Sequence, residues 1–182
     1  MVGRASSHEC SSATPSPKSA RARSPHPCTL REDRPRDRVD RVTTRSSRSP
    51  AEMFDRARDI GLHTASQSAA GERAVAGVVS GLIGPGEEVT WRARHFGVPL
   101  LLTSRITAFD APHRFVDEQI RGPFARFRHE HLFEADGTGS VMTDRLDYSA
   151  PLGPLGSIAE RLVLTRHLRR LLQERGAFLA AP

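Results

Sequence analysis

The segment Ala125–Phe133, with the sequence ARFRHEHLF, decides how the chain folds and raises its main question. Phe127, His129, His131 and Phe133 occupy alternate positions in it. Successive side chains of a strand point to opposite faces, so the pattern predicts a strand that presents two aromatic rings and two imidazoles to one face. Imidazoles on a hydrophobic face need polar partners or access to solvent.

Alternating segments on both sides of this strand predict an antiparallel sheet. The expected strands are Glu72–Val79, Glu87–Phe96, Val98–Phe109, Arg114–Arg121, Phe124–Phe133 and Ser140–Ser149, with a weaker first strand near Val39–Arg45. Short connections rich in Gly, Pro and Asp separate most of them. Such connections favour a meander in which sequence neighbours pair.

Two helical patterns flank the predicted sheet. Ser49, Pro50 and Glu52 match a helix start, with Ser as N-cap and Pro at the first helical position. That helix is expected to bury Met53, Phe54 and Ala57. From Gly153 onward, apolar residues at helical spacing predict one long amphipathic helix; they are Ile158, Leu162, Leu164, Leu168, Leu171, Leu172 and Leu179. Packing that helix on one face of the sheet gives an α+β fold.

The basic character of the chain belongs to its N-terminal tail. The first 50 residues hold 11 basic and 5 acidic residues, which accounts for the net charge of +6, while the remainder holds 16 of each. We expect residues 1–38 to form a disordered Arg/Ser/Pro-rich tail and residues 39–182 to form one domain; a start assigned too far upstream is one hypothesis for the tail. A neutral domain argues against nucleic-acid binding.

The chain offers few signs of export or membrane insertion. No apolar run is long enough to span a bilayer, and the tail lacks a secretory signal, so we expect a cytoplasmic protein. Cys10 and Cys28 have no metal-binding or redox spacing and are read as free thiols. A basic run on the last helix, Arg166, Arg169, Arg170 and Arg175, is typical of a solvated face.

Turn symmetry predicts how the strands pair. Pairing Phe133 with Met142 puts His131 opposite Asp144, and the same register puts His129 opposite Leu146 and Phe127 opposite Tyr148. A hairpin centred on Gly97-Val98 puts Trp91 opposite Ser104, Ala93 opposite Leu102 and His95 opposite Leu100. An even loop at Gly122-Pro123 puts Asp117 opposite Arg128 and turns Glu118 inward, where it meets His129. An odd loop would instead turn Asp117 and Gln119 inward.

The resulting inner face mixes apolar and ionisable side chains. We expect a ligand to contact Trp91, His95, Leu102, Ser104, Ile106, Val116, Phe127, Met142, Leu146, Tyr148, Leu164 and Leu168. His129, His131, Asp144 and Glu118 are the acid–base candidates. Unpaired buried charge is costly, so these groups either satisfy one another or line a cavity. The two histidines with His95 or Asp144 could ligate a metal, but strand spacing alone is weak support and we expect none.

Several stretches together resemble one superfamily. The stretches GEEVTWRARHFGVPL, TSRITAFDAPHRFVDEQIRGPF, FRHEHLF and DRLDYSAPLGPLG, followed by a terminal helix, are similar to the SRPBCC superfamily of START-like and polyketide cyclase/dehydrase-like proteins. The likeness covers about residues 48–179, and TTRSSRS before Ser49 is more polar than the family's first strand. It implies a helix-grip fold, in which a curved antiparallel sheet of about seven strands wraps around a long C-terminal helix and two short helices follow the first strand.

The resemblance also bears on function. It implies an apolar cavity between sheet and helix that binds a small hydrophobic molecule of lipid or polyketide type, without a cofactor. The alternative is a polyketide cyclase or dehydratase that uses a histidine–carboxylate pair in the same cavity. A third interpretation is an interaction or stress-response protein whose cavity is incidental. The ligand and the oligomeric state do not follow from the sequence.

Overall fold

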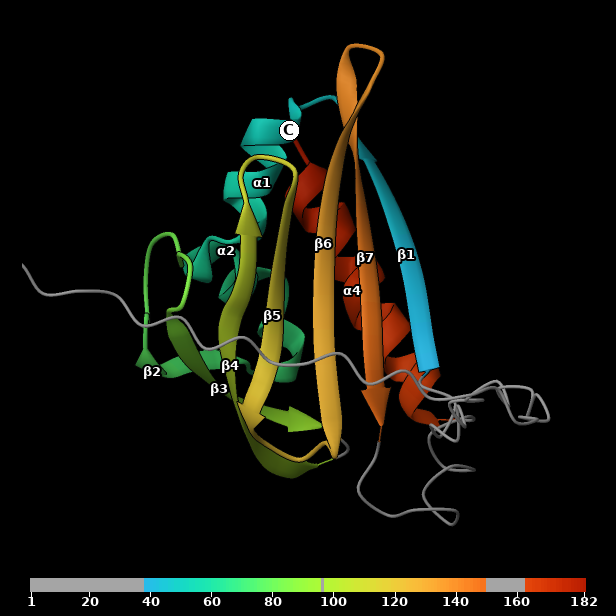
Figure 1. Ribbon diagram of the computed structural model, residues 1–182. Helices are drawn as coiled ribbons and strands as arrows, with labels where there is room; N and C mark the ends of the chain where they lie inside the picture. The colour runs from blue at the N-terminus through green and yellow to red at the C-terminus, as the bar shows by residue number, and fades with distance from the viewer. Residues whose placement is uncertain (1–37, 96, 150–162) are drawn as a thin grey trace, which may run out of the picture. The chain divides into compact units, whose positions relative to one another are not determined.

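Seven antiparallel strands form one sheet in the computed structural model, which describes residues 38–95, 97–149 and 163–182 (Figure 1). The strands are β1 (Arg38–Ser46), β2 (Arg73–Gly77), β3 (Glu88–His95), β4 (Val98–Asp110), β5 (Arg114–Arg121), β6 (Arg126–Asp136) and β7 (Gly139–Ser149). Their order, β1-β7-β6-β5-β4-β3-β2, confirms the meander and places the first strand beside the last. The polar segment before Ser49 is therefore a strand after all.

Within the described residues, three α-helices and one 3₁₀ turn accompany the sheet. They are α1 (Pro50–Ala57), α2 (Ile60–Ser66), the turn Ser68–Ala70 and α4 (Thr165–Ala180). Ser49 caps α1 as expected, because its hydroxyl accepts from the Glu52 amide at 3.2 Å. Asp59 caps α2 in the same way, accepting from the Leu62 amide at 2.9 Å. Two short helices thus follow the first strand, as the resemblance implied.

Helix α4 lies against the sheet, with α1 and α2 on the same side (Figure 1). Its approach to β1 is close, because a Cβ atom built on Gly176 would lie 2.1 Å from Thr44 Oγ1. Arg169 of α4 also pairs with the buried Asp40 of β1. The predicted helical residues Ile158 and Leu162, and the tail of residues 1–37, lie outside the described part of the chain.

Two apolar clusters attach the helices to the sheet. In the first, Phe54 of α1 meets Phe109, Phe115 and Phe133 edge-on, with ring centroids 5.3 to 5.5 Å apart. The residues expected to be buried on α1, including Phe54, are buried. The second cluster joins strands β1 and β7 to α4 and contains Val42, Leu146, Tyr148 and Leu172. Between α2, α4 and the sheet the interior is not filled.

The strand registers confirm one prediction and correct two. Strands β6 and β7 pair as predicted, with His131 opposite Asp144. In the β3–β4 hairpin Trp91 faces Leu102, two residues from the predicted partner, so every side chain keeps its face. Between β5 and β6 Asp117 faces His129, a shift of one residue that exchanges the faces of β5.

The shift in β5 has a local cause at the Gly122-Pro123 turn. The Gln119 side-chain amide donates to the Phe124 carbonyl at 2.8 Å and accepts from the Phe124 amide at 3.2 Å. A side chain therefore takes the place of a backbone partner at the end of the hairpin. Turn symmetry counts backbone positions and takes no account of this side-chain contact, which explains why it predicted the even loop.

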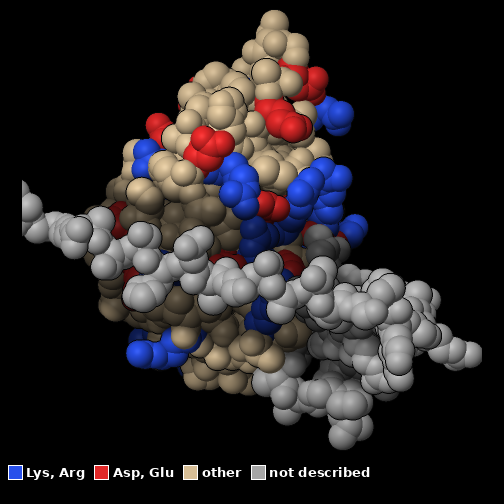
Figure 2. Space-filling model, in the orientation of Figure 1, with Lys and Arg blue, Asp and Glu red and all other residues tan. Residues whose placement is uncertain are grey.

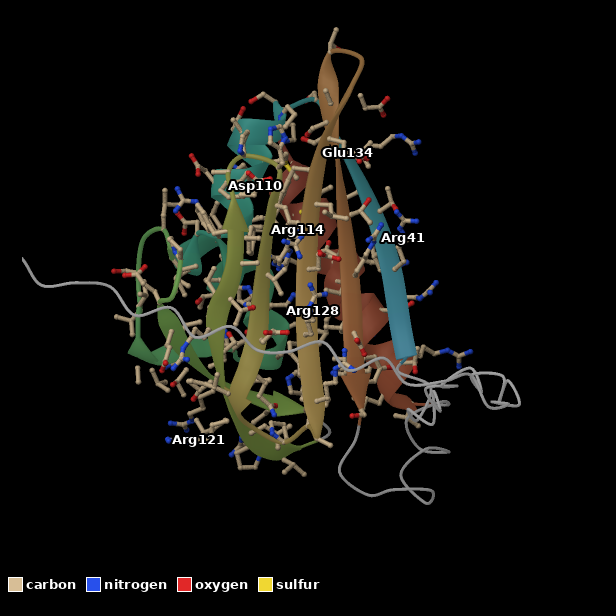
Figure 3. The ribbon with its side chains drawn as sticks, viewed as in Figure 1. Arg41, Asp110, Arg114, Arg121, Arg128 and Glu134 are labelled. Atoms are coloured by element: carbon tan, nitrogen blue, oxygen red, sulfur yellow. The ribbon has the colours of Figure 1, made fainter. Side chains whose placement is uncertain are left out.

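The outer face of the sheet carries charges of both signs (Figures 2 and 3). Arg114 pairs with Glu130 at 2.7 Å, and Arg128 reaches Glu118 at 3.4 Å. Arg145 adds a contact to Glu130 at 3.6 Å. The positive groups visible on this face are thus interspersed with carboxylates. Among the described residues, no helix is both long and apolar enough to cross a membrane.

Candidate functional site

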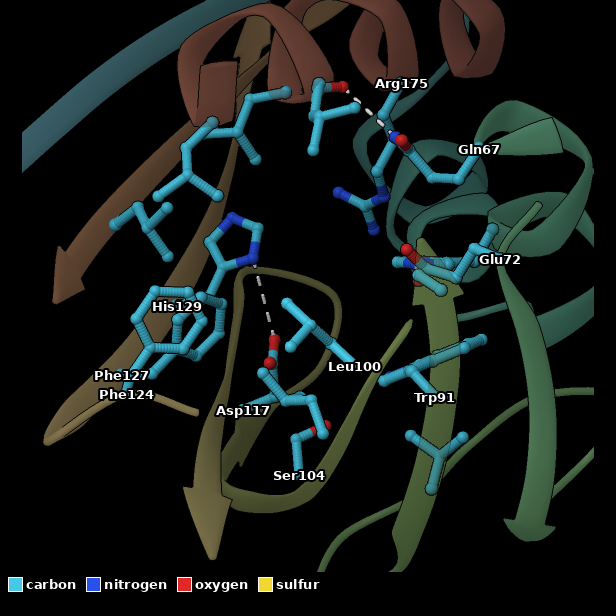
Figure 4. Close-up of a pocket in the computed structure, with 18 of the residues that line it drawn as sticks. Gln67, Glu72, Trp91, Leu100, Ser104, Asp117, Phe124, Phe127, His129 and Arg175 are labelled. Atoms are coloured by element: carbon cyan, nitrogen blue, oxygen red, sulfur yellow. Dashed lines mark hydrogen bonds and ion pairs between the residues drawn. The ribbon is translucent and has the colours of Figure 1, made fainter. Parts of the chain in front are cut away.

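A cavity of about 470 Å³ lies between the sheet, α2 and α4 (Figure 4). Its wall is mainly apolar. The predicted ligand-binding residues that line it are Trp91, His95, Leu102, Ser104, Ile106, Phe127, Leu146, Leu164 and Leu168, and the predicted acid–base residues that line it are His129 and His131. Residues that the sequence analysis did not select include Ile60, Val89, Leu100, Phe124, Leu171 and Leu172.

Three residues predicted to contact ligand lie elsewhere. Val116 is buried on the opposite face of β5, because the shift between β5 and β6 turns Phe115 and Asp117 inward instead. Met142 is fully buried in the apolar cluster around α1. Tyr148 is buried behind the wall, where its hydroxyl donates to Thr165 at 2.7 Å.

The polar end of the cavity contains the two histidines and two aspartates. His129 Nε2 lies 2.9 Å from Asp144 Oδ1, and His131 Nδ1 lies 2.8 Å from the same oxygen. On the other side, Asp117 Oδ1 lies 3.1 Å from His131 Nε2 and 3.8 Å from His129 Nδ1. All four ring nitrogens therefore face a carboxylate. Figure 4 shows Asp117 and His129 turned toward one another. We call these four residues the His/Asp cluster.

The predicted role of Glu118 requires correction. The sequence analysis placed Glu118 beside His129, but Glu118 pairs with Arg128 on the outer face of the sheet. Asp117 takes the inward position instead, as the alternative odd loop implied. A carboxylate does lie beside His129, as predicted, but it belongs to Asp117 and not to Glu118.

Arg175 is a buried cation that the sequence analysis assigned to a solvated face. Its side chain is 4% exposed and reaches the cavity from α4 (Figure 4). Nη2 donates to the Ala57 carbonyl at 2.6 Å, and Nη1 lies 3.5 Å from Asp144 Oδ1. The helical period could have placed it, because Leu168, Leu172 and Leu179 share its face of α4.

Burial and hydrogen bonding set the charge states of the cluster. Burial alone would raise the pKa of Asp144, but contacts with His129 and His131 outweigh it and hold that pKa well below its usual range. Burial would raise the pKa of Asp117, but the hydrogen bond with His131 and the charges of His129, His131 and Arg175 together lower it. Burial and the neighbouring His131 lower the pKa of His129. The carboxylates are thus ionised, while burial favours a neutral His129.

A second group of polar residues lies at the other end of the wall. His63 Nε2 lies 2.6 Å from Glu72, and its ring stacks on Trp91 with centroids 4.1 Å apart. His95 Nδ1 lies 3.0 Å from His167 Nε2, which links the β3–β4 hairpin to α4. Burial and the nearby His95 lower the pKa of His167. These contacts orient the rings that line the cavity.

One set of side chains has the composition of a metal site. Asp117, His129 and His131 each bring one ligand atom to within 4.8 Å of the others. Imidazole nitrogen and carboxylate oxygen are ligands for zinc and ferrous iron. Asp144 lies on the far side of both rings, in the position of an outer carboxylate.

Structural comparisons identify the fold. A protein of Thermus thermophilus, TTHA0849, matches with a TM-score of 0.63 and 17% identity over 78% of this chain and 97% of its own. A START superfamily protein of Mycobacterium smegmatis matches with a TM-score of 0.55 and 13% identity over 78% and 98%. The KanY protein matches with a TM-score of 0.64 and 15% identity over 79% and 95%. The chain therefore shares the fold of these proteins, which is the helix-grip fold that the sequence resemblance implied.

At these identities the likeness establishes the fold and leaves the activity to be argued from the site. No protein-family model matches the chain, and no curated protein matches it in sequence.

Proposed function

We propose that the protein binds a small hydrophobic molecule of lipid or polyketide type in the cavity between sheet and α4. The observation that carries this proposal is a mainly apolar space of about 470 Å³ that also has several polar groups in its wall. Ligand sites typically enclose about 300–1,000 Å³ and combine apolar walls with a few polar groups that fix orientation. The His/Asp cluster would fix the orientation of a polar group on the ligand.

Two neighbouring leucines of β4 allow a matched test of binding. Leu102 lines the cavity, whereas Leu101 points outward and is 58% exposed. We expect Leu102→Trp to weaken binding of the fluorescent apolar probe 8-anilinonaphthalene-1-sulfonate at least about tenfold, because the larger ring fills space that the probe needs. Leu101→Trp should leave its affinity unchanged. Equal affinity in the two variants would contradict binding inside the cavity.

Native mass spectrometry of gently purified protein addresses the natural ligand. We expect a co-purified molecule whose mass is lost after extraction with organic solvent. A protein that stays empty when it is offered a lipid extract would instead favour the interpretation in which the cavity is incidental.

The His/Asp cluster favours a second candidate, an enzyme that cyclises or dehydrates a carbonyl compound. The imidazole of His131, which lies 2.8 Å from Asp144 and lines the cavity, is suited to pass a proton to or from a bound substrate. We expect His131→Gln to leave probe affinity within about twofold while abolishing turnover. Unchanged turnover of a polyketide-like substrate in this variant would remove His131 from the reaction.

A further inference from the structure

The His/Asp cluster contains more acceptors than its own hydrogens can satisfy. A neutral imidazole carries one N–H, so two neutral histidines can donate from two of their four ring nitrogens. All four of these nitrogens lie 2.8 to 3.8 Å from an oxygen of Asp117 or Asp144. Two nitrogen lone pairs would therefore face carboxylate oxygens unless a proton or another cation lies between them.

Burial makes extra protons a costly solution. The side chains of His131 and Asp144 are 2% and 0% exposed, and His129 is 10% exposed. Desolvation opposes the charging of a buried imidazole. Asp144 Oδ2 and His131 Nδ1 make no directed hydrogen bond within the described part of the chain. The cluster thus has unsatisfied negative character.

The charges around the cluster favour a cation at one position. Asp144 is offset by Arg175, whose Nη1 lies 3.5 Å away. Asp117 carries the remaining negative charge and faces one nitrogen of each histidine. A site between these three atoms would also meet the cavity, because Asp117, His129 and His131 all line it.

We propose that Asp117, His129 and His131 bind a divalent transition-metal ion, zinc or ferrous iron, through Asp117 Oδ1, His129 Nδ1 and His131 Nε2. In this arrangement His129 Nε2 donates to Asp144 Oδ1 at 2.9 Å, and His131 Nδ1 lies 2.8 Å from the same oxygen. Ligand atoms about 2.0–2.2 Å from a tetrahedral zinc ion lie roughly 3.3 Å apart. The contacts of 3.1 and 3.8 Å to Asp117 Oδ1 bracket this separation.

The proposed set departs from the expectation of no metal because of the register of β5. With Glu118 outside and Asp117 inside, the H-x-H pair gains the third ligand that its strand could not provide. Asp144 then acts as an outer carboxylate that orients both rings. Three protein ligands leave a coordination position open toward the cavity. The site is independent of the apolar wall on which the proposed ligand binding rests.

Adjacent acids on β5 provide a matched test with Co²⁺ as the probe. We expect the metal-free full chain to bind one equivalent of Co²⁺ with the strong visible absorption of a four-coordinate nitrogen–oxygen site. Asp117→Asn and His131→Gln should each weaken binding by about 100-fold or more, and Asp144→Asn by roughly 10- to 100-fold. Glu118→Gln removes a neighbouring carboxylate from the outer face and should bind as the wild type does.

The controls make each outcome decisive. His95→Gln removes a cavity histidine outside the cluster and should retain the Co²⁺ spectrum, and the tail residues Cys10 and Cys28 are common to all variants. Urea unfolding verifies that each variant is folded. Wild-type protein without the Co²⁺ spectrum, or Asp117→Asn with wild-type affinity, would overturn the proposal. Probe binding by metal-free protein tests the apolar cavity separately, so the two proposals can fail independently.

Discussion

At the scale of single residues, Asp144 holds the polar end of the cavity together. Its side chain is fully buried and faces His129, His131 and Arg175. A buried carboxylate with cationic and imidazole partners is weak support for stability by itself, but its removal leaves the partners uncompensated. The alternating pattern predicted Asp144 beside His131, because the β6–β7 register follows from a short turn. It could not predict Arg175, which arrives from another element.

We expect Asp144→Ala to lower the free energy of unfolding by about 3–5 kcal/mol, because the Arg175 guanidinium loses its buried counter-charge. Glu118→Ala removes a carboxylate from an exposed ion pair with Arg128 and should cost less than about 1 kcal/mol. Urea unfolding followed by the fluorescence of Trp91, the single tryptophan of the chain, measures both. Equal losses in the two variants would contradict the register of β5.

At the scale of elements, the position of α4 depends on a close contact with β1. Gly176 has no side chain where a Cβ would lie 2.1 Å from Thr44 Oγ1 and 3.2 to 3.3 Å from the two carbons of the same side chain. Rotation of Thr44 cannot relieve all three contacts. The leucine spacing predicts the helix, but only its packing reveals why a glycine lies within it.

Replacement of Gly176 by Ala should therefore destabilise the fold by about 1–3 kcal/mol, although alanine favours helix formation. The exposed Gln173 of the same helix provides the control, since Gln173→Ala should change stability by less than about 0.5 kcal/mol. Chemical unfolding in urea gives both values. A Gly176→Ala variant more stable than the wild type would show that β1 can move away from the added methyl group at little energetic cost.

The contact between the β3–β4 hairpin and α4 predicts a pH dependence. Burial and His95 lower the pKa of His167, Arg170 adds to the effect, and Glu174 opposes it. The unfolded chain then binds this proton more readily than the folded chain. The contribution of neutral His167 to the free energy of unfolding should be fully present above the ordinary histidine pKa of about 6.5. It should be lost as the pH drops below that value toward the lower pKa of the folded state.

We expect His167→Gln to lose less stability than the wild type between neutral pH and about pH 5, because one of the groups that takes up a proton on unfolding is absent. His113→Gln, which replaces an exposed histidine in the β4–β5 turn, should keep the wild-type slope. Urea midpoints measured across this pH range provide the comparison. Parallel curves for wild type and His167→Gln would exclude the contribution of His167.

At the scale of the whole molecule, the interior is divided between packed clusters and an open cavity. Phe54 and its aromatic neighbours fill one region, and Leu146, Tyr148 and Leu172 fill another. The space between them exposes apolar surface that a bound molecule would cover. A ligand that binds only the folded chain must stabilise it.

Addition of 8-anilinonaphthalene-1-sulfonate at 100 times its dissociation constant should therefore stabilise the protein by about 2.7 kcal/mol. For a domain of this size the melting temperature should rise by about 5–10 °C. Scanning calorimetry measures the shift, and Leu102→Trp should reduce it at the same probe concentration. An unchanged melting temperature in the wild type would argue against a pocket formed in the folded state.

The sequence by itself determined the periodicities and the positions of the turns: the meander of strands, the capped helix α1 and the amphipathic helix α4. These features depend on contacts between near neighbours, so alternation, capping residues and leucine spacing are enough to predict them. Only the tertiary structure decided that Asp117 rather than Glu118 faces His129, and that Arg175 is buried beside Asp144. The first depends on how the β5–β6 hairpin closes, where the Gln119 side chain bonds Phe124, and the second depends on α4, which lies over the sheet. A change of one residue in strand register moves every side chain of the strand to the opposite face. The register therefore decides which polar side chains line the cavity.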